Sequence, residues 1–142
     1  MTILVIEDSR LLRSAISRIL VKAGFQVTAV GDGREGLTYA EATRPDMILL
    51  DMMLPTMEGT AVLRQLKTNL LTKQIPVVVL SGLAQKNDRK LLADGASGYI
   101  EKSTLDFDGD GSTLLAVLQP LLGHGTHLAE RTTGAVRYEA RA

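Results

Sequence analysis

Five polar residues that could perform chemistry stand at or just after the ends of short apolar runs in the sequence. They are Glu7, Asp8, Asp51, Ser81 and Lys102. If these runs are neighbouring parallel strands, their carboxyl ends meet at one edge of a sheet, and the five side chains lie together there. Three clustered carboxylates repel one another, which raises the pKa of at least one of them unless cations lie nearby. The set therefore predicts a site that contains a divalent metal and an ammonium group.

The chemistry that this set favours is the transfer of a phosphoryl group to a carboxylate. Asp51, the central member, is placed to attack phosphorus and become an aspartyl phosphate. The Lys102 ammonium can balance the charge of one phosphoryl oxygen, and the Ser81 hydroxyl can donate a hydrogen bond to another. Oxygen ligands suit Mg²⁺, which pairs with one or two carboxylates and a phosphoryl oxygen. Each residue taken singly has an ordinary role as a helix cap, turn residue or solvated charge. The prediction therefore depends on all of them occurring together at the ends of the strands.

The stretch that would position Asp51 is a run of four apolar residues, 47–50, between two acids. Such a run is too short for a helix and is typical of a central parallel strand that helices cover on both faces. Pro55 cannot donate a hydrogen bond to a neighbouring strand, so the strand ends before it. Further strands are predicted at 3–6, 25–30, 77–80 and 98–100.

Helical patterns alternate with these strands. In residues 10–23 apolar side chains recur at spacings of three and four, which makes a wide apolar stripe that includes Leu11. Ser9 or Asp8 can cap this helix. Further helices are predicted at 34–43, 61–70, 87–93 and 112–122, with Leu70 and, as a candidate, Tyr39 facing the sheet. Alternating strands and helices predict an α/β domain with a doubly wound, five-stranded parallel sheet in the flavodoxin-like order 2-1-3-4-5.

Length and composition describe one ordinary globular domain. The chain has 142 residues, of which 45% are hydrophobic and 23% charged, which is enough for a single full core. Sixteen acidic and sixteen basic residues balance, so no global charge favours nucleic acid or an anionic membrane. With no cysteine, and no apolar run that suits a signal peptide or a membrane span, we expect a cytoplasmic protein. Residues 1–122 are assigned to the domain and 123–142 to a tail or the start of a linker.

Two other motifs in the sequence suggest functions that we set aside. Residues 31–36 match the dinucleotide-binding pattern GxGxxG, and Asp51 follows at the spacing of its acidic partner. A turn followed by a helix start explains them better, because the dinucleotide interpretation leaves the first strand and its acidic pair without a role. Residues 106–111 fit the first half of a calcium loop, but the glutamate required at its twelfth position is missing.

The strand-end residues together resemble the receiver domain of two-component response regulators, which has the CheY-like fold. The resemblance extends from about residue 3 to residue 122. It depends on the acidic pair Glu7-Asp8, Asp51 within Asp-Met-Met-Leu-Pro, Gly59, Ser81-Gly82 and Lys102. The chain departs from the family pattern at Ser103, where members usually have a proline, and the loop before the last helix is longer than usual.

This resemblance implies a role for each acidic residue. Asp51 would be the phosphoacceptor. Asp8 and Asp51 would bind Mg²⁺ together with the backbone carbonyl of Met53, and Glu7 would act on the metal through a water molecule. The predicted metal set is therefore Glu7, Asp8, Asp51 and Met53.

A conformational switch is also implied by the resemblance. Ser81 and Lys102 would hold the phosphoryl group, and Tyr99 stands at the aromatic switch position of the family. Ordering of Ser81, the loop after it and Tyr99 would then change the surface made by the fourth helix, fifth strand and fifth helix.

Together these implications predict a phosphorylation-controlled switch that is not an enzyme, since it catalyses only its own phosphorylation and dephosphorylation. Its phosphodonor would be a sensor histidine kinase or a phosphotransfer protein of a phosphorelay. Its target would be a downstream effector protein or an output domain, with homodimerisation on activation as a further option. No direct contact with nucleic acid or membrane is expected.

Two alternatives from other classes stay open. A haloacid-dehalogenase-like phosphatase also uses a strand-end aspartate, a lysine and Mg²⁺, but it needs a second aspartate where this chain has Met53. A receiver-like module that binds its partner without phosphorylation is disfavoured by the intact Asp8, Asp51 and Lys102.

Overall fold

The computed structural model of the chain describes residues 1–82, 88–105 and 111–125. A five-stranded, all-parallel sheet forms its centre. The strands are β1 (Thr2–Ile6), β2 (Gln26–Val30), β3 (Met47–Asp51), β4 (Val77–Ser81) and β5 (Gly98–Glu101). Their order across the sheet is β2-β1-β3-β4-β5, which confirms the flavodoxin-like order expected from the sequence.

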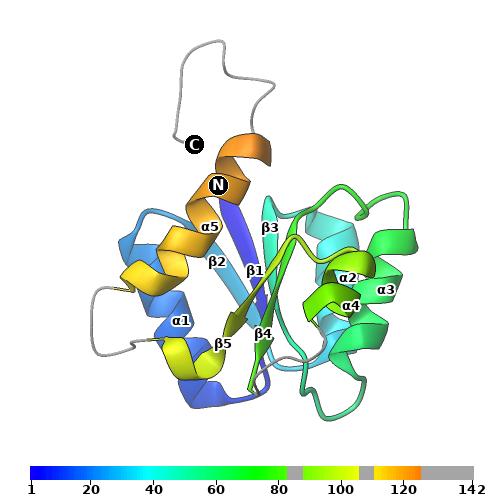
Figure 1. Cartoon of the computed structure of the whole chain (residues 1–142), viewed down its shortest axis with the longest axis horizontal. Helices are drawn as coiled ribbons and strands as arrows, with labels where there is room; N and C mark the ends of the chain where they lie inside the picture. Colours follow the sequence, from blue (N-terminus) through cyan, green and yellow to red (C-terminus); the bar gives the residue numbers. More distant parts are fainter. Residues whose placement is uncertain (83–87, 106–110, 126–142) are drawn as a thin grey trace.

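Helices cover both faces of this sheet and give the domain three layers. They are α1 (Arg10–Lys22), α2 (Gly33–Thr43), α3 (Gly59–Thr68), α4 (Asp88–Ala93) and α5 (Ser112–Gly125), and a short 3₁₀ helix, η1 (Lys102–Thr104), follows β5. In Figure 1, α1 and α5 lie on one face of the sheet, and α2, α3 and α4 lie on the other.

The central strands are buried on both faces, which explains why their sequences are continuously apolar. In β1, Leu4 and Ile6 belong to the core under α2 and α3, whereas Ile3 and Val5 belong to the core under α1 and α5. Successive side chains of a strand point to opposite faces, so one apolar run serves both cores. Each such fully buried side chain contributes roughly 1.5–3 kcal/mol relative to an exposed one.

Three apolar residues that the sequence pattern placed against the sheet are exposed instead. Leu11 is 83% exposed, Tyr39 38% and Leu70 79%. Leu11 lies in the first turn of α1, where the next residue, Leu12, is the one that packs against the core. Leu70 lies beyond α3, which ends at Thr68. The prediction that these side chains face the sheet was wrong.

Several boundaries differ slightly from the sequence-based ones. α5 continues to Gly125, past the predicted end at Leu122. The proposed tail beyond 125, the calcium-loop residues 106–110 and the first predicted residue of the fourth helix, Asn87, lie outside the described residues. Among the residues that the structure describes, no helix combines the length and the apolar character that crossing a membrane would need.

Candidate functional site

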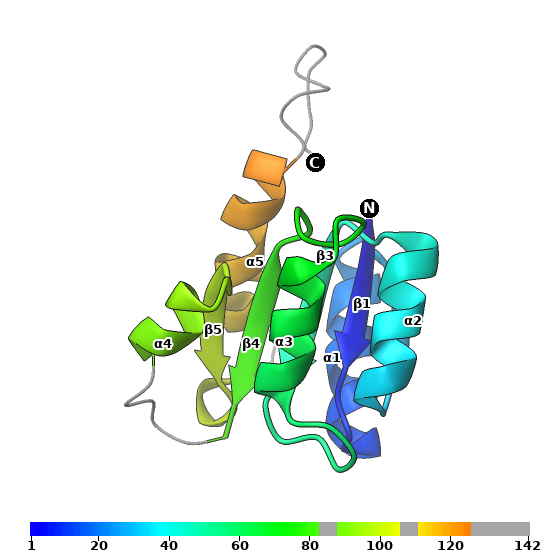
Figure 2. The ribbon, with the colours of Figure 1, turned by 90° about the vertical axis from the view of Figure 1, so that its right-hand side faces the viewer.

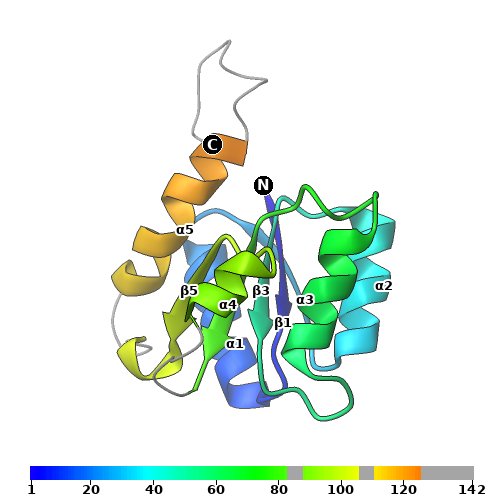
Figure 3. The ribbon, with the colours of Figure 1, turned by 45° about the vertical axis from the view of Figure 1, so that its right-hand side comes forward.

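The ends of four strands bring the predicted site residues to one edge of the sheet. Glu7 follows β1, Asp51 and Ser81 are the last residues of β3 and β4, and Lys102 follows β5 as the first residue of η1. The strands are parallel, with Ser81 opposite Glu101, so their carboxyl ends coincide. In Figures 2 and 3 the strand arrows point to this edge, at the bottom of the views. The shared edge expected from the sequence is therefore present.

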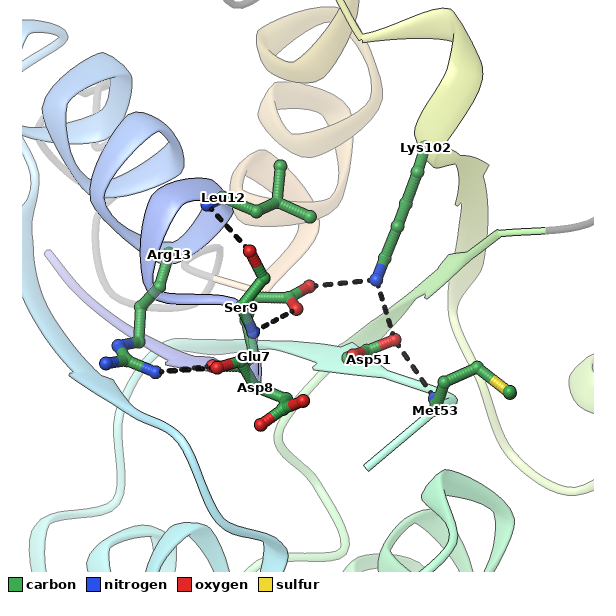
Figure 4. A network of polar contacts seen from close by, with 8 residues as sticks. All are labelled: Glu7, Asp8, Ser9, Leu12, Arg13, Asp51, Met53 and Lys102. Carbon is green, nitrogen blue, oxygen red and sulfur yellow. Dashed lines mark hydrogen bonds and ion pairs between the residues drawn. The ribbon is translucent and has the colours of Figure 1, made fainter. Parts of the chain in front are cut away.

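Lys102 connects two buried carboxylates at this edge. Its Nζ lies 3.0 Å from Oδ1 of Asp51 and 3.1 Å from Oε1 of Glu7 (Figure 4). Glu7 and Asp51 are each only 1% exposed, whereas the Lys102 side chain is 23% exposed. Buried charges are costly unless they are paired, so this ammonium makes the burial of two carboxylates tolerable.

Burial and pairing shift the ionisation of these groups. The pKa of Glu7 is raised, chiefly because burial disfavours the charged form and further because Asp51 is a like charge; the Ser9 amide and Lys102 offset only part of this. For Lys102, burial by itself would lower the pKa, but the hydrogen bond to Asp51 and the attraction of both carboxylates outweigh it, and the pKa is raised. Lys102 therefore remains an ammonium at neutral pH.

The Asp51 carboxylate is held in one orientation by its surroundings. Its Oδ1 accepts a hydrogen bond of 3.0 Å from the backbone N–H of Met53 in addition to the contact with Lys102. Gly59, the first residue of α3, packs directly against this turn: a Cβ there would lie 2.6 Å from the carbonyl oxygen of Asp51 and 2.5 Å from Cα of Met52. Only a residue without a Cβ lets the helix start so close to the end of the strand.

The acidic pair after β1 consists of one buried and one exposed carboxylate. Oε2 of Glu7 accepts a hydrogen bond of 2.9 Å from the backbone N–H of Ser9. The side chain of Ser9 caps α1, because its Oγ accepts a hydrogen bond of 3.2 Å from the N–H of Leu12. Asp8 is exposed, and in Figure 4 its side chain lies outside the contacts that join Glu7, Lys102 and Asp51. The two members of the pair thus contribute differently to the site.

The donor atoms of this edge suit a hard cation such as Mg²⁺. Asp8, Asp51 and the carbonyl of Met53 offer oxygen ligands, and the buried Oε1 of Glu7 has the Lys102 ammonium, at 3.1 Å, as its partner. Within the described parts of the chain, no three His, Cys, Asp or Glu side chains are already gathered closely enough to hold a metal ion. The residues fit Mg²⁺ by their chemistry.

Ser81 and Tyr99 are in place on the neighbouring strands. Ser81 is 3% exposed at the end of β4. Tyr99 of β5 is half-buried and packs against the core under α2 and α3. Residues 83–87, the loop that the switch prediction invokes after Ser81, lie outside the described residues.

One residue at the site was not selected by the sequence analysis. Arg13 of α1 donates from Nη1 to the backbone oxygen of Glu7 at 2.9 Å and to that of Asp8 at 3.3 Å. In the sequence it is one of several arginines on the polar side of a predicted helix, and nothing distinguishes it from Arg10 or Arg18. Which backbone a long side chain reaches depends on tertiary geometry, so no local signal could have found it.

Comparison with known proteins identifies the family. The family described as response regulator receiver domain matches residues 3–108 of the chain. The chain belongs to this family. The receiver domain is 36% identical over 136 residues to the transcriptional regulatory protein CseB of Streptomyces coelicolor, which covers 94% of this chain and 55% of the relative. It is 39% identical over 103 residues to the transcriptional regulatory protein HprR of Escherichia coli, or 72% of this chain and 45% of that protein. It thus spans about half the length of these curated relatives.

Solved structures show the same receiver fold. Vibrio cholerae CheY4 aligns with a TM-score of 0.76 and 30% identity over 85% of this chain and 98% of that chain. The BeF3-activated N-terminal receiver domain of Klebsiella pneumoniae RstA aligns with a TM-score of 0.75 and 30% identity over 84% and 97% of the two chains. The receiver domain of the Pseudomonas aeruginosa sensor histidine kinase PA1611 aligns with a TM-score of 0.76 and 29% identity over 86% of this chain and 97% of that chain. It was solved with a magnesium ion coordinated in its active site cleft.

These relatives confirm that the chain is a receiver domain with the CheY-like fold. Receiver domains of response regulators belong to two-component signal transduction and are not classical enzymes. The phosphatase alternative receives no support from the family match or from these relatives.

Proposed function

We propose that this receiver domain accepts a phosphoryl group on Asp51 from a phosphohistidine of a sensor histidine kinase or a phosphotransfer protein. The observation that carries the proposal is the Asp51 carboxylate: it is 1% exposed, ends the central strand β3 and lies 3.0 Å from the Lys102 ammonium. A nucleophile in such a site has a fixed cation ready for the charge that arrives with the phosphoryl group.

In this transfer a bond forms between phosphorus and Oδ2 of Asp51. The bond between phosphorus and the donor nitrogen breaks, and its electron pair stays on the imidazole. We assign the attack to Oδ2 because the contacts from Lys102 and from the Met53 amide both go to Oδ1. Lys102 and the Met53 amide orient the carboxylate before the phosphohistidine binds, which lowers the entropic part of the barrier to phosphoryl transfer. Lys102 and the hydroxyl of Ser81 then stabilise the phosphoryl oxygens.

For Mg²⁺ we assign Asp8, Asp51 and the backbone carbonyl of Met53 as ligands, with Glu7 acting through a water molecule. The bound ion supplies positive charge against the phosphoryl oxygens. Support comes from the oxygen atoms at this edge, from the two buried carboxylates of Glu7 and Asp51 that share the single Lys102 ammonium, and from the magnesium ion in the PA1611 receiver.

The phosphorylated state would be transmitted through Ser81 and Tyr99. Tyr99 lies on β5 two residues before Glu101, the residue opposite Ser81, so a rearrangement at Ser81 acts directly on its strand. The surface of α4, β5 and α5 would change as a result. Its target would be a downstream effector protein, an output domain or a second copy of the chain; regulators such as CseB are about twice as long as the matched region.

Phosphorylation of Asp51 can be tested by mass spectrometry of the intact protein. Incubation with acetyl phosphate and Mg²⁺ should add the mass of one phosphoryl group to the parent protein, and Asp51→Asn should add none. Asp46→Asn is the matched control, because Asp46 is exposed at the opposite end of the same strand, where it accepts a hydrogen bond from Thr2. Phosphoryl transfer to Asp51→Asn, or loss of it in Asp46→Asn alone, would contradict the assignment.

A further inference from the structure

Arg13 joins α1 to the backbone of the acidic pair. Its Nη1 donates to the carbonyl oxygens of Glu7 and Asp8 at 2.9 and 3.3 Å. The last hydrogen bond between this stretch and β2 is the one from the N–H of Glu7 to the carbonyl of Val30, at 3.0 Å. After Glu7 the chain leaves the sheet. There the Arg13 guanidinium donates the hydrogen bonds that hold the backbone of Glu7 and Asp8. Figure 4 shows Arg13 on the side of the acidic pair away from Lys102.

Gly31, the residue after β2, provides the space for this guanidinium. A Cβ at position 31 would lie 2.7 Å from Nη1 of Arg13 and 3.8 Å from the carbonyl oxygen of Glu7. Such a contact is too short for an ordinary carbon–nitrogen approach, so an alanine there would push Arg13 away from the acidic pair. The first glycine of the GxGxxG pattern therefore serves close packing beside the site.

We propose that Arg13, packed against Gly31, is a positioning residue that fixes the backbone of Glu7 and Asp8 and thereby sets the affinity of the site for Mg²⁺. The inference rests on the proposed function, in which Asp8 and Asp51 bind the metal. Asp8 is exposed and its carboxylate is not fixed by burial. Its value as a ligand then depends on a backbone that is already ordered, because binding otherwise has to order the loop as well.

The charge of Arg13 and its positioning role have opposite effects on Mg²⁺ binding. As a cation near two carboxylates, Arg13 repels Mg²⁺, so removing its charge alone would strengthen binding. As a group that holds metal-ligating residues in place, its loss weakens binding, and the loss of comparable outer groups reduces metal affinity by about 10–100-fold. If an uncharged variant of Arg13 binds Mg²⁺ more weakly than the parent does, the positioning role of Arg13 outweighs its charge repulsion.

The experiment measures Mg²⁺ binding by titration calorimetry, without any phosphodonor. Arg13→Gln should bind Mg²⁺ about tenfold more weakly than the parent. Arg13→Lys should recover part of the loss, because an ammonium can still donate to these carbonyls. Gly31→Ala should bind more weakly although it retains the arginine. Arg18→Gln, which removes the same charge from an exposed position of the same helix, should bind as the parent does.

A second measurement separates binding from chemistry. Because Arg13 contacts backbone atoms and not the reacting carboxylate, the rate of phosphorylation by acetyl phosphate at saturating Mg²⁺ should be the same in Arg13→Gln as in the parent. Only the Mg²⁺ concentration that gives half of this rate should rise. A maximal rate that stays low at saturating Mg²⁺ would overturn the positioning role.

Each remaining outcome has a defined meaning. Mg²⁺ affinity of Arg13→Gln equal to or above that of Arg18→Gln would overturn the inference. If thermal melting shows that Arg13→Gln does not fold, Gly31→Ala decides, and unchanged affinity there would overturn the inference as well. A parent protein that binds no Mg²⁺ or accepts no phosphoryl group would contradict the proposed function instead.

Discussion

Glu7 and Asp51 bring two carboxylates into a site that is almost closed to solvent, and Lys102 is the cation they share. One ammonium cannot fully compensate two buried anions, and the raised pKa of Glu7 reflects this. Burying charge that is only partly paired lowers stability, and proteins retain such arrangements at functional sites. The remaining negative charge of the two carboxylates would attract a metal ion to this site.

Glu7→Gln should change how stability depends on pH. The pKa of Glu7 is raised in the folded state, mainly by burial, so the folded protein binds more protons here than the unfolded chain. The contribution of Glu7 is therefore most favourable below its ordinary pKa and is lost as pH rises through the raised value. The variant has no such loss, so it should gain stability over the parent as pH rises from about 4 to about 7.

Urea unfolding of the parent and Glu7→Gln at several pH values measures this difference. Glu58→Gln is the control, because Glu58 is exposed and its side chain makes no cap hydrogen bond to α3. The stability difference between Glu7→Gln and the parent should therefore change across this pH range. A constant difference would show that burial does not raise the pKa of Glu7 in the folded state.

At the scale of elements, short contacts between loops set the position of the site. The N–H of Gly59 donates to the carbonyl of Met52 at 3.1 Å, which closes the turn between β3 and α3. The hydroxyl of Thr56 in the same turn donates to Asp32, the cap of α2, at 2.7 Å. Together with Arg13, these contacts tie the connections after β1, β2 and β3 to one another.

Gly59→Ala should destabilise the domain by about 1–3 kcal/mol, the usual cost of forcing atoms into a closely packed region. The new Cβ would meet backbone atoms of Asp51 and Met52, which cannot move without displacing Asp51, the proposed phosphoacceptor. The free energy of unfolding measured with urea tests this, together with the rate of phosphorylation, which should fall. Gly82→Ala is the matched control because no atom of the described residues lies within 4 Å of a Cβ at that position. Equal stabilities of the two variants would refute the packing argument.

At the scale of the whole molecule, stability and function occupy different regions. Two apolar cores on the faces of the sheet hold the strands, and the polar residues gather at the carboxyl edge. Changes at that edge can therefore alter ligand binding without opening the cores. The exposed Asp8 is the clearest case, because its side chain contributes to neither core.

Mg²⁺ should therefore stabilise the whole domain through Asp8. A ligand that binds only the folded state adds about 2.7 kcal/mol at a concentration one hundred times its Kd, so saturating Mg²⁺ should raise the melting temperature of the parent. In Asp8→Ala this rise should largely disappear, while the melting temperature without Mg²⁺ stays close to that of the parent. Thermal melts in MgCl₂ and in KCl of equal ionic strength make the comparison. An equal rise in both proteins would show that Asp8 is not a ligand of the proposed metal site.

Residue patterns along the chain were enough to predict the strands, their order and the edge where the site residues meet. The apolar run before Asp51 can only be buried on both faces, and parallel strands connected by helices must end at the same edge. Residue types then indicated phosphoryl chemistry for Asp51, Ser81 and Lys102. The strands, their order and their shared edge are confirmed, because periodicity and strand polarity are local properties of the chain. The roles of Asp51, Ser81 and Lys102 in phosphoryl chemistry stay predictions.

Contacts between side chains of different elements could not be predicted in this way. Leu11 and Leu70 fit an apolar pattern but are exposed, since Leu12 packs against the core in place of Leu11 and Leu70 lies beyond the end of α3. The contact of Arg13 with the acidic pair, the burial of Glu7 beside an exposed Asp8 and the close approach of Gly31 all join residues from different elements. Such contacts depend on the relative placement of packed elements, which no local pattern encodes.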